Sequence, residues 1–318
     1  MRILARLFSL TLALFYAFNP YVPPSDATPI TASLDSRLRF IAWADPQISN
    51  YMPKRDPFFV AACEDVKNAD VRFDAMVIAG DIAENGLACE YDHVSEYLYA
   101  ENVRNYLIAV GNHDVRLRNY AQTIKRFTAF TNGLNQRSGS NMALNSLHYR
   151  LDIKGYTFLI LGTDRTEFEE SYLSDAQLQW LDASLKDAAS NGKPVFVVCH
   201  QSFKLSHGLP DTWNSPFDFA GSIGDQSDAL KTILSSYPNV IFISGHLHTG
   251  FGAFTYENIG GIHSVNLPSL TINNKDGNRN DNGLGCFVEV FADEVVFHAR
   301  NFAKGENIPE EDIHIALV

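Results

Sequence analysis

Basic side chains are scarce in this chain of 318 residues. It carries 25 lysines and arginines against 37 aspartates and glutamates, a formal net charge of −12, and no basic run or stripe. Proteins that bind nucleic acid depend largely on such residues to neutralise backbone phosphates. The composition therefore disfavours a nucleic-acid partner. It does not exclude a small phosphorylated substrate, because divalent cations reverse the local field whatever the overall charge.

Long hydrophobic runs are also missing. The longest apolar stretch, Leu7–Phe18, follows Arg2 and Arg6 and precedes a proline-rich segment. A membrane-spanning helix needs about 20 apolar residues, whereas this shorter stretch and its flanks are typical of a secretory signal peptide. We predict a signal peptide over residues 1–27, a secreted or periplasmic protein, and no stable membrane span after cleavage. An uncleaved anchor, a lipoprotein and a buried N-terminal helix are the alternatives.

Cysteine is rare, with four residues in the chain. The even count and the expected export permit a disulfide, for which Cys63 and Cys89 are the favoured pair. Cys199 ends an apolar stretch and is expected to be a buried small side chain rather than a ligand or nucleophile. Without a thiolate cluster, a structural zinc site is disfavoured.

No linker rich in proline and serine divides the middle of the chain, and no internal repeat is present. We predict one domain over residues 38–302 and an acidic C-terminal tail over 303–318, in which the acidic segment Glu306–Asp312 is expected to be solvated. The hydrophobic fraction of 46% allows such a chain to bury a large core. The sequence does not specify an oligomeric state.

Short apolar runs alternate with amphipathic segments along the first three quarters of the chain. Runs with little alternation are expected where both faces of a strand are covered. Helices are predicted over Ser174–Ala189, with Ser174 as N-cap and Gln177 completing a capping box, and over Asp225–Ser235. The predicted buried strands are Arg39–Ala44, Ala75–Ala79, Tyr106–Val110, Tyr156–Leu161, Val195–Cys199 and Val240–Ser244.

The last quarter is rich in strand patterns and has no long helix. Expected strands there are Gly252–Tyr256, Ile262–Leu267, Cys286–Phe291 and Glu294–Ala299. Strand and helix patterns thus alternate in the first part of the chain, and strand patterns dominate its end. This order favours an α/β protein with two sheets over a single doubly wound sheet.

Metal-ligand residues follow five of the predicted strands. Strand ends in open α/β sheets gather at one edge, where ligands bind. Each residue alone has an ordinary explanation as a turn, cap or core residue, but five such coincidences at one edge are improbable. The blocks are Ala44-Asp45-Pro46-Gln47, Gly80-Asp81-Ile82, Gly111-Asn112-His113-Asp114, Cys199-His200 and Gly245-His246-Leu247-His248.

The ligand types in these blocks are chemically coherent. Carboxylate and amide oxygens together with imidazole nitrogens suit divalent ions such as Mn²⁺, Fe²⁺ or Zn²⁺. Two ions about 3.5–4 Å apart need a bridging carboxylate, and Asp81 is the natural candidate. The sequence therefore predicts a two-metal hydrolytic centre.

The ordered blocks resemble the calcineurin-like metallophosphoesterase superfamily, over about Arg39 to His248. The family pattern is Asp-x-His, Gly-Asp, Gly-Asn-His-Asp/Glu, His and Gly-His-x-His. The resemblance implies a four-layer α-β-β-α sandwich of two mixed β-sheets flanked by helices. It also implies hydrolysis of small phosphate esters, diesters or monoesters, by a hydroxide that bridges the two ions.

The resemblance also assigns roles. It implies that Asp45 and His248 bind the first metal and that Asp81 bridges. Asn112, His200 and His246 bind the second, with Asn112 also stabilising charge on the substrate. His113 stands near the leaving group as a candidate catalytic acid, with Asp114 orienting its ring.

The chain departs from the family pattern at Gln47, where a histidine is usual. This Asp-Pro-Gln block resembles that of eukaryotic calcineurin-like phosphoesterase domain-containing proteins. An amide oxygen is a weaker donor than imidazole toward Zn²⁺ or Fe²⁺, so we expect a weakly held first metal and a preference for Mn²⁺ or Mg²⁺. Ala83, two positions after Asp81, lacks the aromatic of purple acid phosphatases and favours the phosphodiesterase-like branch.

Substrate contacts are less clearly encoded. The long loop Gln201–Gly221 resembles a substrate lid and offers His207, Trp213 and Asn214. Glu84 and Asn85 would line the pocket mouth or cap the next helix, and Arg116 and Arg118 would hold an anionic group or remain surface charges.

Gln47 leaves a second function open. A phosphoesterase fold that has lost turnover would serve as a binding or scaffold protein. The intact Asn112-His113-Asp114 block favours the enzyme, because a scaffold needs no leaving-group acid.

Overall fold

The computed structural model describes residues 27–213 and 221–318. The expected signal peptide therefore lies, apart from Ala27, outside the described residues. Within the described ranges, no helix combines the length and apolar character needed to cross a bilayer.

Two mixed sheets form the centre of the molecule. In the first, β1, β2 and β3 are parallel and β10 pairs antiparallel with β1, giving the order β12-β11-β10-β1-β2-β3 with β13 paired to β11. Its strands are β1 (Leu38–Trp43), β2 (Ala75–Ile78), β3 (Tyr106–Ile108), β10 (Leu284–Val290), β11 (Glu294–Asn301), β12 (Glu306–Asn307) and β13 (Ile313–Ala316).

The second sheet has the order β4-β5-β6-β7-β9-β8, and its four inner strands are parallel. The edge strands β4 and β8 pair antiparallel with their neighbours. Its strands are β4 (Tyr149–Ile153), β5 (Tyr156–Ile160), β6 (Val195–Val198), β7 (Val240–Ser244), β8 (Tyr256–Ile259) and β9 (Ile262–Asn266).

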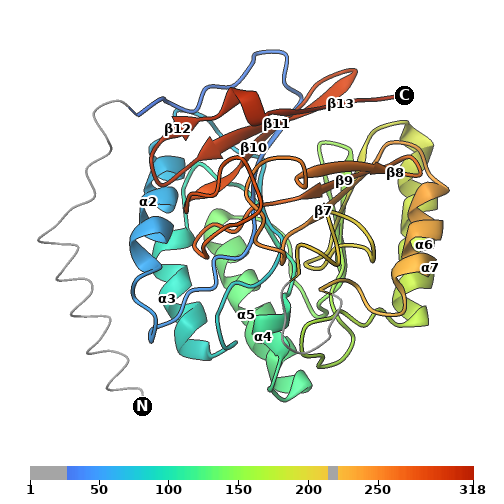
Figure 1. Ribbon diagram of the computed structural model, residues 1–318, viewed down its shortest axis with the longest axis horizontal. Coiled ribbons are helices and arrows are strands. Elements are labelled where there is room, and N and C mark those ends of the chain that lie inside the picture. Colours follow the sequence, from blue (N-terminus) through green and yellow to red (C-terminus); the bar gives the residue numbers. More distant parts are fainter. Residues whose placement is uncertain (1–26, 214–220) are drawn as a thin grey trace, which may run out of the picture.

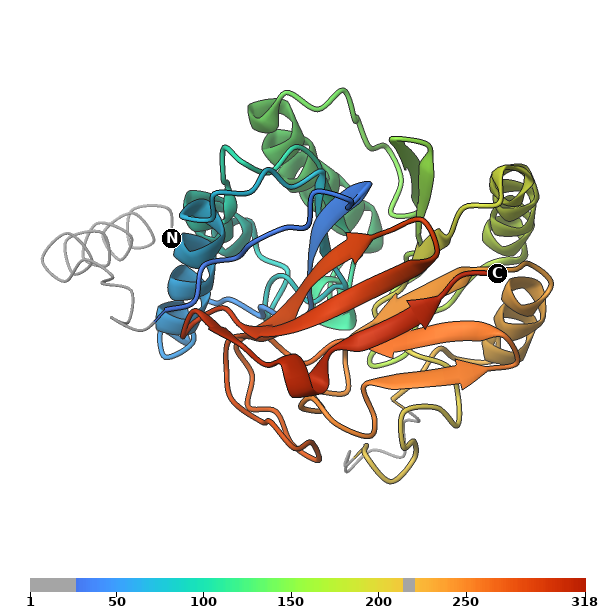
Figure 2. The same ribbon diagram turned by 90° about the horizontal axis from the view of Figure 1, so that it is seen from above.

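Helices cover the outer face of each sheet, so the fold is a four-layer α-β-β-α sandwich. In Figures 1 and 2, α2 and α3 lie on one side of the strands and α6 and α7 on the other. The helices are α2 (Asp56–Lys67), α3 (Ala88–Leu98), α4 (Asn112–Val115), α5 (Tyr120–Ser138), α6 (Asp175–Ala188) and α7 (Ser227–Ser235), with 3₁₀ turns at Ala189–Asn191 and Pro309–Glu311.

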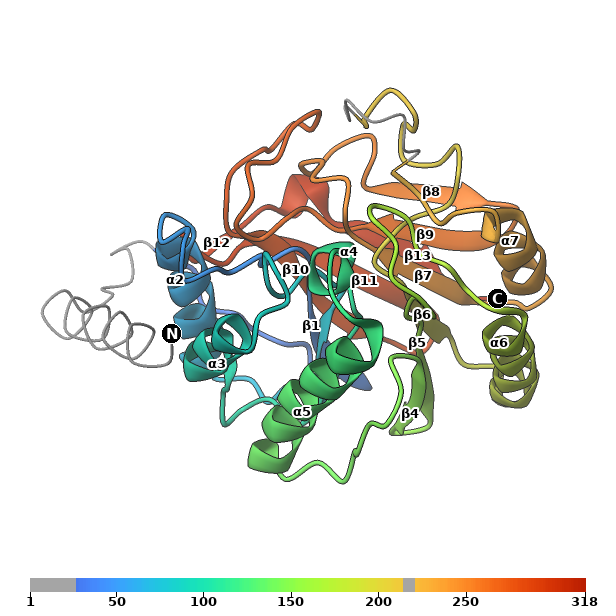
Figure 3. The same ribbon diagram turned by 90° about the horizontal axis from the view of Figure 1, so that it is seen from below.

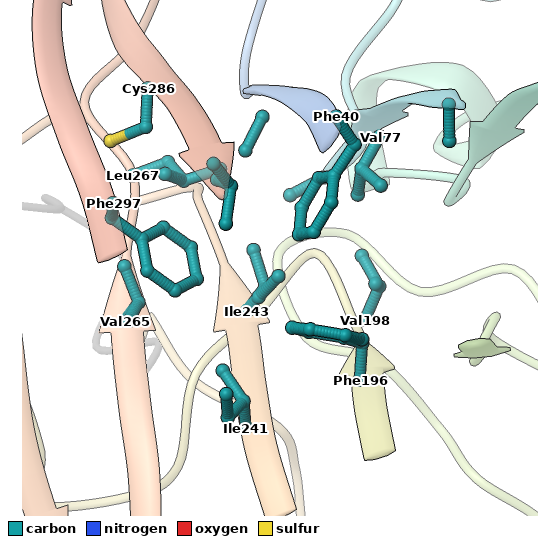
Figure 4. Packing of buried hydrophobic residues seen from close by; sticks show 14 of the residues in the cluster. Phe40, Val77, Phe196, Val198, Ile241, Ile243, Val265, Leu267, Cys286 and Phe297 are labelled. Carbon is teal, nitrogen blue, oxygen red and sulfur yellow. The ribbon is translucent and has the colours of Figure 1, made fainter. Parts of the chain in front are cut away.

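The main hydrophobic core lies between the two sheets. Phe40 of β1 packs edge-to-face on Phe158 of β5 and Phe196 of β6, with ring centroids 5.4 and 5.1 Å apart. Figure 4 shows side chains of both sheets, among them Val77 and Ile243, pointing into this layer. Because both faces of the inner strands are buried, their sequences are continuous apolar runs.

The six buried strands predicted from apolar runs are confirmed as β1, β2, β3, β5, β6 and β7. The helix α6 begins after Ser174, whose hydroxyl accepts from the Gln177 backbone N–H. The Gln177 side chain does not complete a capping box, because it bonds to Gly162 and Asp164 instead. The strand expected at Gly252–Tyr256 is wrong, since β8 begins only at Tyr256.

The chain after residue 302 continues the domain, although within the acidic segment Glu306–Asp312 only Ile308 is buried. β13 pairs with β11 from Glu294 to Phe297, and Ile308, Ile313 and Ile315 are buried in the core between the sheets. Alternating apolar residues bury one face of β13, while its acidic neighbours occupy the turn before it. The sheet therefore continues almost to the C-terminal residue.

The favoured disulfide is corrected as well, because all four cysteines are free thiols. Cys63 is buried in the apolar layer between α2 and the first sheet. Burial raises the pKa of its thiol, so it behaves as a small core side chain. Cys89 lies in the first turn of α3 and is partly exposed.

Candidate metal centre

The five predicted blocks occupy the carboxyl ends of β1, β2, β3, β6 and β7. Since these strands run parallel within each sheet, their following loops meet at one edge. The short helix α4, which carries the third block, lies between the two helical layers (Figure 3). The fold thus brings segments separated by some two hundred residues to one place.

The backbone at this edge is in an unusual conformation. Asp45, Gln47, Asp81, His246 and His248 all have φ between 41° and 73°. Non-glycine residues seldom adopt this left-handed region, and such strain concentrates at functional sites. The strands end in turns that direct these polar side chains toward one another.

Two glycines permit the close approach. A Cβ at Gly111 would overlap the Asp81 carboxylate, and one at Gly245 would stand 2.6 Å from Asp45 Oδ2. The backbone of the turns that follow β3 and β7 can therefore pack directly against the two carboxylates. We expect any side chain at either glycine to displace them.

Asp45 pairs with the fifth block. Its Oδ1 lies 3.2 Å from His248 Nε2, and its Oδ2 accepts from the His246 backbone N–H at 3.0 Å. Asp45 is fully buried, whereas His248 is partly exposed at the mouth of the site. These two side chains form one half of the candidate centre.

The other half surrounds Asp81. His200 Nε2 lies 3.2 Å from Asp81 Oδ2, 3.0 Å from Asn112 Oδ1 and 3.2 Å from His246 Nδ1. Asp45 Oδ1 is 3.8 Å from the same His200 nitrogen, so the two halves adjoin. Asp81, His200 and His246 present ligand atoms that all lie within 4.8 Å of one another.

The far side of the His200 ring fixes its orientation. Nδ1 donates to the carbonyl oxygen of Ala79 at 2.6 Å, and a carbonyl oxygen can only accept. Nε2 is consequently the nitrogen that faces Asp81 and Asn112. Such a bond on the second nitrogen is typical of histidines that ligate metals, because it sets the tautomer and holds the ring.

Electrostatics at the site are dominated by the buried carboxylates. Burial alone would lower the pKa of His200, but Asp81 and Asp45 raise it to about 9. Burial alone would raise the pKa of Asp81, yet His200 and His113 hold it well below its usual value. Burial, together with the charge of His200, lowers the pKa of His246. The site thus combines buried carboxylates with a His200 imidazole that favours its charged form and a His246 imidazole that favours its neutral form.

These residues fit a pair of divalent cations. Asp45 and Asp81 are fully buried, and buried charges require partners or metal ions. His246 Nε2 is buried and receives no hydrogen bond from the described residues. Oxygen donors mixed with imidazole suit Mn²⁺, Fe²⁺ or Zn²⁺.

Gln47 is buried next to the expected bridge. Its Nε2 donates to Asp81 Oδ2 at 2.9 Å, so the amide nitrogen, not the oxygen, faces the carboxylate. Arg55 donates to the main-chain carbonyl oxygen of Gln47 at 2.6 Å. In this geometry Gln47 steadies Asp81 through a hydrogen bond rather than adding a strong donor to the first metal position.

His113 lies at the rim of the pocket. Its backbone N–H donates to Asp81 Oδ1 at 2.9 Å, and its Nε2 is 3.9 Å from Asp81 Oδ2. On the other side of the ring, Nδ1 lies 3.0 Å from the Glu84 carbonyl oxygen and 2.8 Å from Arg116 Nη2. Nε2 is therefore the nitrogen that faces the candidate metal position.

The expected role of Asp114 is corrected by its partners. Its carboxylate accepts from the backbone N–H groups of Ile82, Ala83 and Gly111 and from the Tyr91 hydroxyl, all within 3.3 Å. These four donors leave it turned toward the backbone instead of the His113 ring. Asp114 therefore ties together the loops that follow β2 and β3, and Glu84 contacts the imidazole.

Glu169 belongs to the site although no sequence pattern pointed to it. Its Oε2 accepts from Asn112 Nδ2 at 2.9 Å, and its Oε1 lies 3.2 Å from Arg116 Nη1. It stands in the loop between β5 and α6. The available signal was that β5 ends at the same sheet edge as β6, so its following loop can reach the pocket.

Arg116 and Glu84 are site residues too, while their neighbours are structural. Arg116 pairs with Glu169 and approaches Glu84, which also pairs with Arg55. Arg118 donates to the Asn85 carbonyl oxygen, and Asn85 bonds to Glu90 near the start of α3. Helix capping therefore falls to Glu90 and not to Glu84.

The expected substrate contact of His207 is wrong. The residue is fully buried, with Nδ1 2.7 Å from the Phe254 carbonyl oxygen and Nε2 2.8 Å from Ser264 Oγ. Both nitrogens are occupied by β8–β9 and the loop before them. Trp213 in the same loop stacks on His246 with centroids 4.5 Å apart, and Asn214 lies outside the described residues.

Comparison with known proteins agrees with this geometry. The family model described as calcineurin-like phosphoesterase matches residues 38–250. A 3',5'-cyclic-nucleotide phosphodiesterase of Nostoc sp. is 24% identical over 212 residues, which cover 66% of this chain and 68% of the relative.

Solved structures share the fold at low identity. A dimetal phosphatase from Danio rerio superimposes with a TM-score of 0.58 at 16% identity, over 89% of this chain and all of that one. Purple acid phosphatase PPD1 from seeds of yellow lupin (Lupinus luteus) gives 0.59 at 13% identity, over 91% of this chain and 55% of its own length. At these identities the likeness concerns the fold.

Proposed function

Because the chain belongs to the calcineurin-like phosphoesterase family, and is thus a metal-dependent phosphoester hydrolase, we propose that it hydrolyses small phosphodiesters with two divalent cations. The observation that carries the proposal is the convergence of five strand-end blocks around Asp81. Asp45 and His248 would hold the first cation, and Asn112, His200 and His246 the second. Asp81 would contact both, with Gln47 steadying it.

When bound, two such ions supply Lewis acidity and lower the pKa of water so that hydroxide is available near neutral pH. The protein contributes the remaining parts. Asn112 would contribute Oδ1 to the second cation, because its Nδ2 donates to the Phe168 carbonyl oxygen and to Glu169. His113, with Nε2 turned to the pocket and Nδ1 against Glu84, is placed to protonate the departing oxygen.

Charge balance at the rim favours a diester over a monoester. A phosphomonoester carries close to two negative charges at neutral pH, about −1.5 to −2, and a diester carries one. Arg55 is paired with Glu84, and Arg116 with Glu169. Both arginines are already paired with carboxylates, so neither is free to balance the second negative charge of a monoester.

The experiment compares bis-p-nitrophenyl phosphate with p-nitrophenyl phosphate, using protein reconstituted with Mn²⁺. We expect the diester to give the higher kcat/KM, with the His113→Ala variant as the inactive reference. A reversed preference would contradict the diester assignment. A loaded protein that hydrolyses neither ester would instead support the binding or scaffold role.

We also propose that the protein is exported, on the basis of Arg2, Arg6 and the apolar stretch Leu7–Phe18. Small residues at Ser25 and Ala27 are suitable for cleavage. The mass of the protein recovered outside the cytoplasm tests this. Loss of roughly the first 27 residues is expected, and a full-length protein confined to the cytoplasm would contradict it.

A further inference from the structure

The side-chain amide of Asn112 lies between two environments of opposite character. On one side, Nδ2 is 3.2 Å from the Phe168 carbonyl oxygen and 2.9 Å from Glu169 Oε2. On the other side, Oδ1 faces His200 Nε2 at 3.0 Å. Asn112 is almost fully buried, so neither end of the amide can exchange its partners for bulk water.

Only one orientation of this amide satisfies both sides. A carbonyl oxygen and a carboxylate can accept hydrogen bonds but cannot donate them. The NH₂ group must therefore face Phe168 and Glu169, which turns the oxygen toward His200. A flipped amide would place its oxygen against two acceptors and present hydrogens to a cation.

Glu169 is itself held in place. Arg116 approaches its Oε1 at 3.2 Å and lies over the Phe168 ring, 5.4 Å from the centroid. The Glu169 carbonyl oxygen accepts from Gln201 Nε2 at 2.8 Å, and Gln201 directly follows His200. The acceptor for Asn112 is thus anchored to the same loop that carries the neighbouring ligand.

We propose that Glu169 is a positioning residue that keeps the oxygen of Asn112 turned toward the metal position. It thereby sets the affinity for the one cation that Asn112 shares with His200 and His246. The inference rests on the proposed metal centre and deepens it. Arg116 pairs with the Glu169 carboxylate and holds it in place. This ion pair balances the negative charge that Glu169 brings close to the substrate position.

Two variants separate the hydrogen bond from the ion pair. Glu169→Gln loses the charge that pairs with Arg116 but keeps an oxygen that can accept from Asn112, whereas Glu169→Ala loses both. Partners behind a metal ligand typically contribute about 10- to 100-fold to metal affinity. Titration of Mn²⁺ into metal-free protein by calorimetry should show about a tenfold loss at one of two sites in Glu169→Ala, and a smaller loss in Glu169→Gln.

Glu170→Ala is the matched control. Its carboxylate lies next to Gly224, away from Asn112, and the residue is adjacent in the same loop. Both Mn²⁺ affinities should equal those of the wild type. Circular dichroism melting of each variant distinguishes loss of a ligand orientation from loss of the fold.

A reciprocal exchange provides a second test. Asn112→Asp places a carboxylate against Glu169 and should weaken Mn²⁺ binding at this site. In the Glu169→Gln background, the glutamine amide can donate to that introduced carboxylate, so the same substitution should cost markedly less. This rescue is expected only if the two side chains contact each other directly.

The outcomes are decisive in each direction. The inference is supported if Glu169→Ala loses Mn²⁺ affinity at one site alone and Glu169→Gln keeps part of that affinity. It also requires that Glu169→Gln reduce the loss caused by Asn112→Asp. The inference is overturned if Glu169→Ala binds Mn²⁺ with wild-type affinity, or if Glu169→Gln and Glu169→Ala lose the same affinity. It is also overturned if Glu169→Ala weakens both sites equally. A wild type that binds two ions without hydrolysing diesters refutes the proposed function alone, and one that binds no ion here refutes both.

Discussion

The imidazole of His113 rests on Glu84, with Nδ1 3.0 Å from the carbonyl oxygen and 3.4 Å from Oε1 of that residue. Burial alone would lower the pKa of His113, but Asp81 and Glu84 raise it. Glu84 thus takes the place that the sequence pattern suggested for Asp114. The ring is held by a residue three positions after the expected metal bridge, on a loop that Asp114 secures.

Replacement of His113 by alanine should lower kcat toward phosphodiesters by about 10²- to 10⁴-fold, the usual contribution of a positioned acid. The bound metal should be retained, because the imidazole is not among the expected ligands. Steady-state kinetics with metal analysis of the same sample measures both. Replacement of the exposed His314 is the control and should change neither, whereas an active His113→Ala variant would remove the leaving-group role.

Replacement of Gln47 by histidine should tighten the first metal position. An imidazole is a stronger donor than an amide toward Zn²⁺, and the native amide points its nitrogen at Asp81. Competitive titration of Zn²⁺ and Mn²⁺ into the metal-free wild type and Gln47→His proteins measures the affinity of the first metal position in each protein. Two equally tight sites in the wild type would contradict the expected weak first position.

Replacement of Tyr91 by phenylalanine should destabilise the fold by about 0.5–1.5 kcal/mol, the net contribution of one hydrogen bond. The Tyr91 hydroxyl donates to Asp114 Oδ1 at 2.9 Å in a buried setting. Urea denaturation gives the free energy of unfolding. Tyr99→Phe, whose hydroxyl bond to Arg137 is exposed, should cost clearly less, and equal effects would refute the role of Asp114 in joining the loops.

His298 should make stability depend on pH. Burial alone would lower its pKa, but Asp312 at 2.9 Å and Glu289 at 3.3 Å raise it to about 9. A group whose pKa is raised in the folded state stabilises the fold below its unfolded value, about 6.5. That stabilisation is lost as pH rises through 9.

The measurement is the free energy of unfolding of wild type and His298→Asn between pH 6 and 10. The difference in unfolding free energy between the two proteins should be largest at pH 6. It should decrease as pH rises through the pKa of His298 at about 9. A difference that stays constant over this range would show that the imidazole stabilises the fold without its charge.

The five strands that carry the ligand blocks were predictable because each is a short, largely buried apolar run followed by a polar block. Parallel strands bring such ends together, so the order of Asp45, Asp81, Asn112, His200 and His246 was enough to place them at one edge. The polarity change at each strand end is encoded locally, within a few residues.

Other features depend on contacts that no local pattern contains. Glu169 reaches Asn112 from a loop without a distinctive motif, and the four donors to Asp114 are three backbone groups and one tyrosine from different segments. The pairing of β13 with the first sheet was missed because acidic residues precede it, although Ile308, Ile313 and Ile315 are buried in the core between the sheets. His207 followed a metal ligand closely in sequence, but its loop turns the ring toward β9.

The central claim is that Asp81 joins two cations whose combined presence permits hydrolysis. Mn²⁺ should be titrated into metal-free wild type while bound ions and hydrolysis of bis-p-nitrophenyl phosphate are followed together, beside the Asp81→Asn variant. We predict that activity rises only as the second equivalent binds, and that Asp81→Asn loses at least one ion and the activity. Full hydrolysis with one equivalent or none, or an active Asp81→Asn protein, would contradict the account.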